Sequence, residues 1–538
     1  MAAHLIIAPV VLPLVVGAAM LLLGDRHRNL KGALDVAACF TLVGIAAVLL
    51  GIADASPGGI AGVYRLGDWP SPFAIVLVLD RLSALMLLLT SILASAAVVF
   101  SLARWHRAGA HFHSLFQFLL MGLNGAFLTG DLFNLFVFFE LLLAASYGLA
   151  LHGSGVSRVQ AGLHYIAVNL AASLLFLIGV SLIYGVSGTL NMADLAMRIP
   201  NIAEEDRALL EAGAGILGMA FLLKAGMWPL CFWLPTTYAA ASAPVASIFA
   251  IMTKVGAYIV LRLWLLLFGE GAGASAGLGG GWLVVGGMAT VAFGAIGMLA
   301  SRDMARLATF SVLVSTGTVL AATGMGQVDI TGGALFYLVS STLGISALFL
   351  LVELVERGRD PAADVLAVTR EFYGEDDDID EEDEVGIAIP VTMGVLGLAF
   401  IGCALVIAGL PPLSGFIAKF TLLTAAINPS GLGQGGAIPA SSWALLAVLI
   451  LSGLAAVIAM TQAGIRAFWA SLDPIVPRVR IIEVAPIVVL LILCTAQTVQ
   501  AGPIMRFMQA TAHALHAPAD YIRDVLEPEQ HTRKVGGI

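Results

Sequence analysis

The stretch KAGMWPLCFWLP, from Lys224 to Pro235, places a lysine inside an apolar run that two prolines then break. A lysine near the middle of a bilayer costs about 2.5 to 3.5 kcal/mol to insert even on a mild insertion scale. Pro229 and Pro235 each remove a backbone donor, so they predict an interrupted helix. Interrupted backbone survives at membrane depth only where it is buried in protein or lines a wet cavity. The stretch therefore predicts a polar route through a membrane.

The composition also places the chain in a membrane. Only 11% of its 538 residues are charged and 59% are hydrophobic, whereas soluble domains average about 25% charged residues. Apolar runs of about 20 residues, each long enough to span the hydrocarbon core, recur along nearly the whole length. We predict an all-α polytopic membrane protein with about 14 transmembrane helices, over the approximate ranges 5–23, 32–53, 82–103, 113–130, 133–152, 161–185, 212–235, 243–266, 282–300, 305–324, 331–354, 387–428, 442–464 and 483–500.

The chain carries no motif for soluble chemistry. It has no phosphate-binding glycine loop, no Cys or His cluster and no nucleophile arrangement. The four cysteines lie in or beside apolar runs without paired spacing, which predicts packing residues: Cys39, Cys231, Cys403 and Cys494. We expect no cofactor, no metal and no nucleic-acid partner, and we do not expect the chain to be an enzyme in its own right.

Four ionisable residues lie deep in the apolar runs, namely Glu140, Lys224, Lys254 and Lys419. Glu140 stands alone in Phe-Phe-Glu-Leu-Leu, and the residues at helical spacing from it, Ala144 and Gly148, are small. Small residues at this spacing are typical of a face packed closely against another helix. We therefore expect Glu140 to face the bundle and to pair with Lys224, with a static structural pair as the alternative.

Three further charged residues lie at the ends of predicted helices. Asp80 and Arg81 begin the run 82–103, where we expect an interfacial pair between neighbours. Arg262 follows Lys254 by eight residues, so both lie on nearly the same helix face. Its long side chain is able to reach the interface.

A second interrupted run resembles the first. AGLPPL at 408–413 matches AGMWPL at 225–230 at an offset of 183 residues, with Pro411 and Pro412 as the breaking residues and Lys419 close by. Interrupted helices at corresponding positions indicate an internally repeated transporter. The expected division is residues 1–112 with the first three helices, 113–266 as the first repeat, 282–464 as the second repeat, and 483–538 with the last helix and the C-terminal tail.

The loop charges predict the orientation. The loops on one side of the membrane hold Arg26, Arg28, Lys31, Arg104, Arg107, Arg158, Arg302, Arg306, Arg357, Arg359, Arg370, Arg466, Arg478 and Arg480, and the loops on the other side hold only Arg65, Arg198 and Arg207. By the positive-inside rule the first side is cytoplasmic and both termini lie outside.

An acidic loop, 357–386, separates two of the predicted helices on the cytoplasmic side. Its segment Glu371 to Glu384 carries ten acids and no bases. Such a run is normally solvated. Gathering of cations and docking of a partner are the alternatives.

Over roughly residues 75–465 the chain resembles a known family. The motifs are Phe-Glu140-Leu, the stretch from Lys224 to Pro235, the segment from Ala243-Pro-Val to Lys254-Val-Gly-Ala-Tyr258, and Leu-Pro-Pro-Leu-Ser-Gly-Phe-Ile-Ala-Lys419. They resemble the proton-translocating, antiporter-like subunits shared by respiratory NADH dehydrogenase and the Mrp-type multisubunit cation/proton antiporters. The resemblance implies fourteen helices, two inverted repeats, and a proton relay through Glu140, Lys224, Lys254 and Lys419.

The lysine at position 419 makes the chain most similar to the D subunits of the Mrp antiporters, which work beside other membrane subunits. The chain departs from the family at residues 337–346, where many relatives carry a histidine and then a lysine and this chain has no ionisable group. Water held by Ser340, Ser341 and Thr342 is one way to bridge the gap. The alternative is that the proton route does not run the full length.

We therefore expect a subunit of a Na⁺(K⁺)/H⁺ antiporter in the cytoplasmic membrane of a prokaryote, driven by the proton-motive force. Its partners would be lipid, the transported ions and the other membrane subunits. The first alternative is a proton-pumping subunit of an NADH:quinone oxidoreductase or a membrane-bound hydrogenase. The second is a scaffold subunit that transports nothing.

Overall fold

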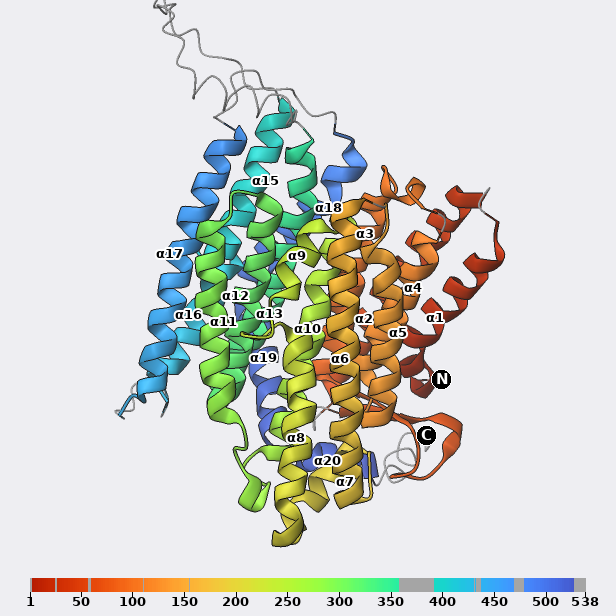
Figure 1. Cartoon of the computed structure of the whole chain (residues 1–538), viewed down its shortest axis with the longest axis vertical. Helices are drawn as coiled ribbons and strands as arrows, with labels where there is room; N and C mark the ends of the chain where they lie inside the picture. The colour runs from red at the N-terminus through yellow and green to blue at the C-terminus, as the bar shows by residue number, and fades with distance from the viewer. Residues whose placement is uncertain are drawn as a thin grey trace, which may run out of the picture.

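The structure, a computed structural model, describes residues 2–24, 27–56, 60–109, 111–153, 155–357, 391–429, 431, 437–468 and 479–526. The acidic segment 371–384 lies outside this range. Long helices run side by side through most of the molecule (Figure 1).

The elements follow the chain in one order. They are α1 (Ala2–Leu22), α2 (Arg28–Ala55), β1 (Ile60–Arg65), η2 (Leu66–Asp68), β2 (Val76–Asp80), α3 (Arg81–Ser101), η3 (Trp105–Arg107), α4 (Phe112–Leu128), α5 (Leu132–Ala150), α6 (Val156–Ser187), α7 (Met192–Arg198), η4 (Ile199–Asn201), α8 (Glu204–Ala225), α9 (Trp233–Ala240), α10 (Ala243–Phe268), η5 (Gly273–Ser275), α11 (Gly280–Ala300), α12 (Met304–Met325), α13 (Val328–Glu356), α15 (Val391–Ala408), α16 (Ser414–Ile427), α17 (Ala440–Phe468), α18 (Ile481–Val499), α19 (Ala501–His516) and α20 (Ala519–Leu526).

The helices confirm the predicted number of membrane crossings. Thirteen helices of the described residues are long and apolar enough to cross a membrane, and α4 is a shorter apolar helix. These thirteen helices and α4 make fourteen crossings, because α9 and α16 continue the crossings that α8 and α15 begin. The expected all-α polytopic architecture is confirmed.

The two faces of the bundle differ in their elements. The N-terminus, α7 and α20 lie at one face (Figure 1), which we call the terminal face. The antiparallel pair β1 and β2 joins α2 to α3 there. The opposite face, which we call the loop face, carries the junctions α1–α2, α3–α4 and α11–α12. A chain with an even number of crossings returns to the face on which it started.

The central helices are buried along almost their whole length. The most apolar window of α10 is 100% buried, and those of α13 and α12 are 94% and 89% buried. The corresponding windows of α1, α2 and α18 are only 33% buried, so these helices form the outer wall. The centre of the bundle is therefore where a charge is best protected from lipid.

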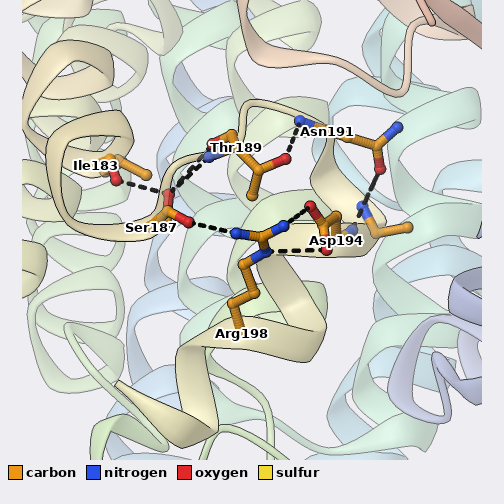
Figure 2. Close-up of polar contacts among 7 residues, drawn as sticks. Ile183, Ser187, Thr189, Asn191, Asp194 and Arg198 are labelled. Carbon is orange, nitrogen blue, oxygen red and sulfur yellow. Dashed lines mark hydrogen bonds and ion pairs between the residues drawn. The ribbon is translucent and has the colours of Figure 1, made fainter. Parts of the chain in front are cut away.

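A polar turn between α6 and α7 holds the start of α5 at the terminal face. Figure 2 shows Arg198 donating to the Ser187 carbonyl at 2.9 Å and pairing with Asp194, with an Arg198 Nη2 to Asp194 Oδ2 distance of 3.0 Å. The backbone N–H of Leu132 donates to the Leu190 carbonyl at 2.9 Å. The turn therefore fixes the first residue of the helix that carries Glu140.

Both predicted interruptions are present. The helix α8 ends at Ala225 and is followed by Gly226 at φ 71°, and α15 ends at Ala408 and is followed by Gly409 at φ 76°. This left-handed conformation favours glycine because it has no Cβ.

The hydrogen bonds at the two breaks also correspond. The Met227 N–H donates to the Leu222 carbonyl at 3.0 Å, and the Leu410 N–H donates to the Leu405 carbonyl at 2.9 Å. Every member of the second set lies 183 residues after its counterpart in the first. The sequence match at this offset is therefore also a match in backbone structure, and the division into repeat domains remains a prediction.

Candidate proton relay

Lys224 lies in the last turn of α8 with its ammonium inside the protein. Its side chain is buried, and Nζ has no hydrogen-bond partner among the described residues. The ammonium instead lies 4.7 Å from the centroid of the Phe139 ring. A desolvated cation–π contact is worth about 2 kcal/mol, which offsets only part of the cost of burying the charge.

Glu140 lies on α5 beside that ring and is only half-buried. Its carboxylate accepts a short hydrogen bond from the Ser173 hydroxyl of α6. The expected direct pair with Lys224 is absent among the described residues, because Phe139 contacts the ammonium and Ser173 contacts the carboxylate.

The face of α5 that carries Glu140 also differs from expectation. A Cβ added to Gly148 would lie 2.6 Å from Leu115 Cδ1, so Gly148 does pack against α4. Ala144, however, is exposed, as are Phe133 and Val137. Glu140 therefore lies at the edge of the bundle rather than inside it.

The end of α8 packs directly against α10. A Cβ added to Gly256 would lie 2.7 Å from the Ala225 nitrogen and 2.9 Å from the Phe221 carbonyl oxygen. Gly256 is two residues from Lys254, so close helix packing brings the chain segments of Lys224 and Lys254 together.

Lys254 is fully buried in the middle of α10. Its Nζ donates to Ser315 Oγ at 2.7 Å and to Thr316 Oγ1 at 2.9 Å, both on α12. The ammonium is therefore held by neutral hydroxyls, which are able to accept its protons.

A directed hydrogen-bond chain leaves Lys254. Ser315 Oγ lies 2.7 Å from Ser341 Oγ on α13, and Ser341 donates to the Tyr337 carbonyl at 2.7 Å. Because the Ser341 hydrogen goes to that carbonyl, Ser341 accepts from Ser315. Every donor in the chain thus points away from Lys254.

A second link joins α13 to α16. Ser340 Oγ lies 2.7 Å from Ser414 Oγ in the first turn of α16. Thr342 donates to the Leu338 carbonyl of its own helix at 2.5 Å. Of the three hydroxyl residues expected to bridge this gap, Ser340 and Ser341 therefore bond to neighbouring helices, whereas Thr342 bonds within α13.

Lys419 occupies the second break. Its Nζ donates to the Ala408 carbonyl at 2.8 Å and to the Ile407 carbonyl at 3.3 Å. These are the last carbonyls of α15, which have no partner within the helix. The ammonium therefore caps α15.

The remaining predicted residues shape the two breaks and the wall beside Lys254. Pro229 lies between α8 and α9, Pro235 lies in the first turn of α9, and Pro411 and Pro412 lie between α15 and α16. Tyr258 donates to the Phe127 carbonyl at 2.6 Å.

Sequence reasoning missed the partners of the charged residues. Ser173, Ser315 and Thr316 contact charged residues, and Ser414 contacts Ser340. All four are small hydroxyl residues whose only sequence signal is that they interrupt apolar runs. A buried cluster in the N-terminal helices was also missed: Asp35 lies 2.6 Å from His113 Nδ1 and accepts from Gln117 Nε2 at 2.6 Å.

The comparisons with known proteins identify the family of the chain. A family model described as NADH:quinone oxidoreductase/Mrp antiporter, TM, matches residues 129–433. The chain belongs to the NADH:quinone oxidoreductase/Mrp antiporter family. The matched range contains Glu140, Lys224, Lys254 and Lys419.

Three relatives show how far the family likeness extends. The D subunit of a probable K⁺/H⁺ antiporter from Rhizobium meliloti is 62% identical over 97% of this chain and 97% of its own length. The D subunit of a Na⁺/H⁺ antiporter from Alkalihalophilus pseudofirmus is 32% identical over 97% and 99%. A chain in the solved Mrp complex of Dietzia sp. DQ12-45-1b has a TM-score of 0.81 at 25% identity, with coverage of 97% of this chain and 99% of that chain.

Among the described residues, hydrogen bonds do not join the four residues of the predicted relay into one chain. Lys254 is joined by hydroxyls to α13, and Lys419 lies on α16, where it donates to the carbonyl of Ala408 across the second break. Lys224 and Glu140 lie at the other end, without a hydrogen bond that joins them to Lys254 among the described residues.

Proposed function

We propose that the chain is the D subunit of a multisubunit Mrp-type antiporter, which exchanges Na⁺ or K⁺ for protons across a prokaryotic cell membrane. The names of the relatives that are 62% and 32% identical over nearly the full length support antiport. The observation that carries a role in proton transfer is the directed chain from Lys254 through Ser315 to Ser341.

Proton transfer begins at Lys224, the relay lysine whose ammonium has no hydrogen bond among the described residues. Burial favours the neutral form of a lysine, and a nearby carboxylate favours the charged form. Lys224 has no hydrogen bond among the described residues to hold its charge, so movement of Glu140 towards or away from it changes the balance. A proton released there moves to Lys254 and then along the hydroxyls towards Lys419.

The driving force is large enough for this movement. A membrane potential of 100 mV supplies about 2.3 kcal/mol per charge. Placing a lysine at the centre of a bilayer costs about 2.5 to 3.5 kcal/mol on the insertion scale. The two energies are comparable, so the free energy released by one proton that crosses the whole membrane is large enough to offset the burial of one charge on its way.

The loop face is the cytoplasmic face in this proposal. Basic residues gather in its loops, for example Arg104, Arg107 and Arg357, and they are scarce in the loops of the terminal face. The positive-inside rule then places both termini outside.

A partner subunit covers Glu140. Its carboxylate lies beside the exposed side chains of Phe133 and Val137, at the edge of α5. An acid exposed to lipid is costly, whereas an acid at an interface between subunits has access to polar partners. We therefore place another membrane subunit of the complex against this edge.

The test uses everted vesicles from a host that lacks its own sodium antiporters and expresses the complete operon. Lactate oxidation builds a proton gradient, and a pH-sensitive dye reports its collapse on addition of NaCl or KCl. We expect collapse with the wild type and with Glu205→Ala, a matched loss of an exposed acid at the terminal face, and none with Glu140→Ala.

The result also separates the alternatives. No cation response from an assembled wild-type complex would contradict antiport, and pumping driven by NADH would then favour the redox-driven alternative. A full response with all four relay residues neutralised would favour the scaffold. Loss of the Glu140→Ala complex from the membrane would indicate a structural role for Glu140.

A further inference from the structure

Arg262 is a second buried cation on the helix of Lys254. It follows Lys254 by eight residues, about 12 Å along the axis towards the terminal face. Its Nη2 donates to both carboxylate oxygens of Asp80, at 2.8 Å and 2.7 Å. Both side chains are buried.

This pair replaces the one expected from the sequence. Arg81 does not pair with Asp80: it donates to the carbonyls of Asp54 and Ser56 at 3.1 Å and 3.0 Å and lies 3.8 Å from the Asp54 carboxylate. The expectation that Arg262 reaches the interface is also wrong. In both cases the arginine binds a residue that is distant in the sequence, which the local pattern of charges does not predict.

Asp80 is held in place by its own helix. It is the N-cap of α3, and its Oδ1 accepts from the Ser83 N–H at 2.7 Å, while Ser83 Oγ accepts from the Asp80 N–H at 2.9 Å. A carboxylate fixed in this way fixes the guanidinium that it binds.

Tyr258 lies between Lys254 and Arg262 on α10. Its hydroxyl accepts from Arg262 Nε at 2.9 Å and donates to the Phe127 carbonyl at 2.6 Å. Its one hydrogen is therefore already donated. No hydrogen of the Tyr258 hydroxyl remains to continue a donor chain from Lys254 towards the terminal face.

The helix α20 covers the other side of the guanidinium. The Arg262 Cζ lies 5.6 Å from the centroid of the buried Tyr521 ring. Burial raises the pKa of Tyr521 to about 12, so the phenol stays neutral at physiological pH. A pocket of about 30 Å³ lies beside Asp80, Arg262 and Tyr521, which is room for one or two water molecules.

We propose that Arg262, fixed by Asp80 and covered by Tyr521, is an electrostatic seal that stops a proton on Lys254 from leaving directly towards the terminal face. The Arg262–Asp80 pair carries no net charge, but its guanidinium end faces Tyr258 through Nε while Asp80 binds Nη2. A fixed positive end on a poorly hydrated path repels a proton, as arginines do in selective pores. With this direction closed, the hydrogen bonds from Lys254 lead to Ser315 and Ser341, where the chain ends at the Tyr337 carbonyl until the Ser341 hydroxyl turns to another acceptor. The inference rests on the proposed function and adds a role for the C-terminal helix.

The experiment measures passive proton leak through the purified complete complex in liposomes, with a pH gradient imposed and without added Na⁺. Arg262→Gln keeps a hydrogen-bonding side chain and removes the charge. We expect leak to rise about tenfold, the factor for removing one unit charge about 12 Å away at an effective dielectric constant of about 20. Arg207→Gln, which removes a charge at the same face but outside this pocket, should not leak.

Two further variants make the test decisive. Combining Arg262→Gln with Lys254→Ala should return the proton leak to the wild-type rate, because the leaking proton passes through Lys254. Tyr521→Ala should leak and Tyr521→Phe should not, and this pair decides the question if Arg262→Gln fails to assemble.

The proposed role of Arg262 would be wrong if liposomes with the Arg262→Gln complex leaked protons no faster than those with the wild type. It would also be wrong if the leak of Arg262→Gln persisted when Lys254 is replaced by alanine. Either result is compatible with normal antiport by the wild type. Failure of antiport itself appears separately, as a wild-type complex that gives no response to Na⁺ or K⁺.

Discussion

The two interrupted helices have the same backbone arrangement and use their lysines in different ways. At the α15–α16 break, Lys419 donates to the carbonyls of Ile407 and Ala408, so its charge completes the end of a helix. At the α8–α9 break, the Leu223 carbonyl accepts from Trp233 Nε1 at 3.2 Å. Lys224 is left without a hydrogen bond among the described residues.

The difference separates a lysine that supports structure from one that is free to change its charge. An ammonium that caps a helix end gains charge-assisted hydrogen bonds and a favourable helix dipole. An ammonium that has only an aromatic ring gains less. We infer that Lys224 is the switching lysine and that Lys419 has a structural role in addition to its place in the relay.

Lys224→Met should give the largest effect. Loss of a proton-transfer group typically lowers a rate by about 10²-fold or more, so cation-driven proton movement in vesicles should fall by that order. Thermal unfolding of the complex should occur at an unchanged or higher temperature, because the variant removes a buried charge that lacks a hydrogen bond among the described residues. A lower unfolding temperature would contradict the assignment of Lys224 as the switch.

Lys419→Met sharpens the comparison by its effect on stability. The substitution leaves the carbonyls of Ile407 and Ala408 unpaired. Each unsatisfied buried group costs about 1 to 3 kcal/mol, so the unfolding temperature should fall relative to both wild type and Lys224→Met. Equal unfolding temperatures for the two methionine variants would remove the distinction between the breaks.

Alanine at the bridging serines should give the smallest effect. Ser341→Ala and Ser340→Ala each remove one inter-helix hydroxyl contact. The antiport rate should fall about threefold to tenfold, as expected for a loss of about 1 kcal/mol per hydrogen bond in the transfer path. Thr342→Val is the matched control, because the Thr342 hydroxyl donates within its own helix. Equal rates for the three variants would place the path elsewhere.

Much of this architecture follows from local sequence. The lengths of the apolar runs predict the crossings, and the prolines predict both breaks. The structure adds that Gly226 and Gly409 turn the chain there in the left-handed conformation. The buried lysines can be recognised in the sequence because a charge inside an apolar run is costly and requires a compensating partner or a wet cavity. These properties depend on neighbouring residues along one chain segment.

The contacts of the charged residues do not follow from sequence, because they join distant segments. Asp80 has Arg81 beside it in the chain, yet it binds Arg262, 182 residues away. Glu140 has small residues at helical spacing, yet its carboxylate binds Ser173 at the edge of the bundle. Hydroxyl partners are the hardest to predict, since serine and threonine also satisfy themselves on their own helix.

Ser340 and Ser341 are successive residues on α13, and each contacts a different neighbouring helix. Successive side chains on an α-helix point about 100° apart, so the two hydroxyls do not form one continuous chain in this arrangement. The link between the Lys254 side and the Lys419 side is therefore a contact that is open at rest. Among the described residues no hydrogen bond joins Ser414 to Lys419 either. Side-chain rotations or water molecules at these two places would close the link, and transport would then be timed by motions far smaller and faster than a movement of whole helices.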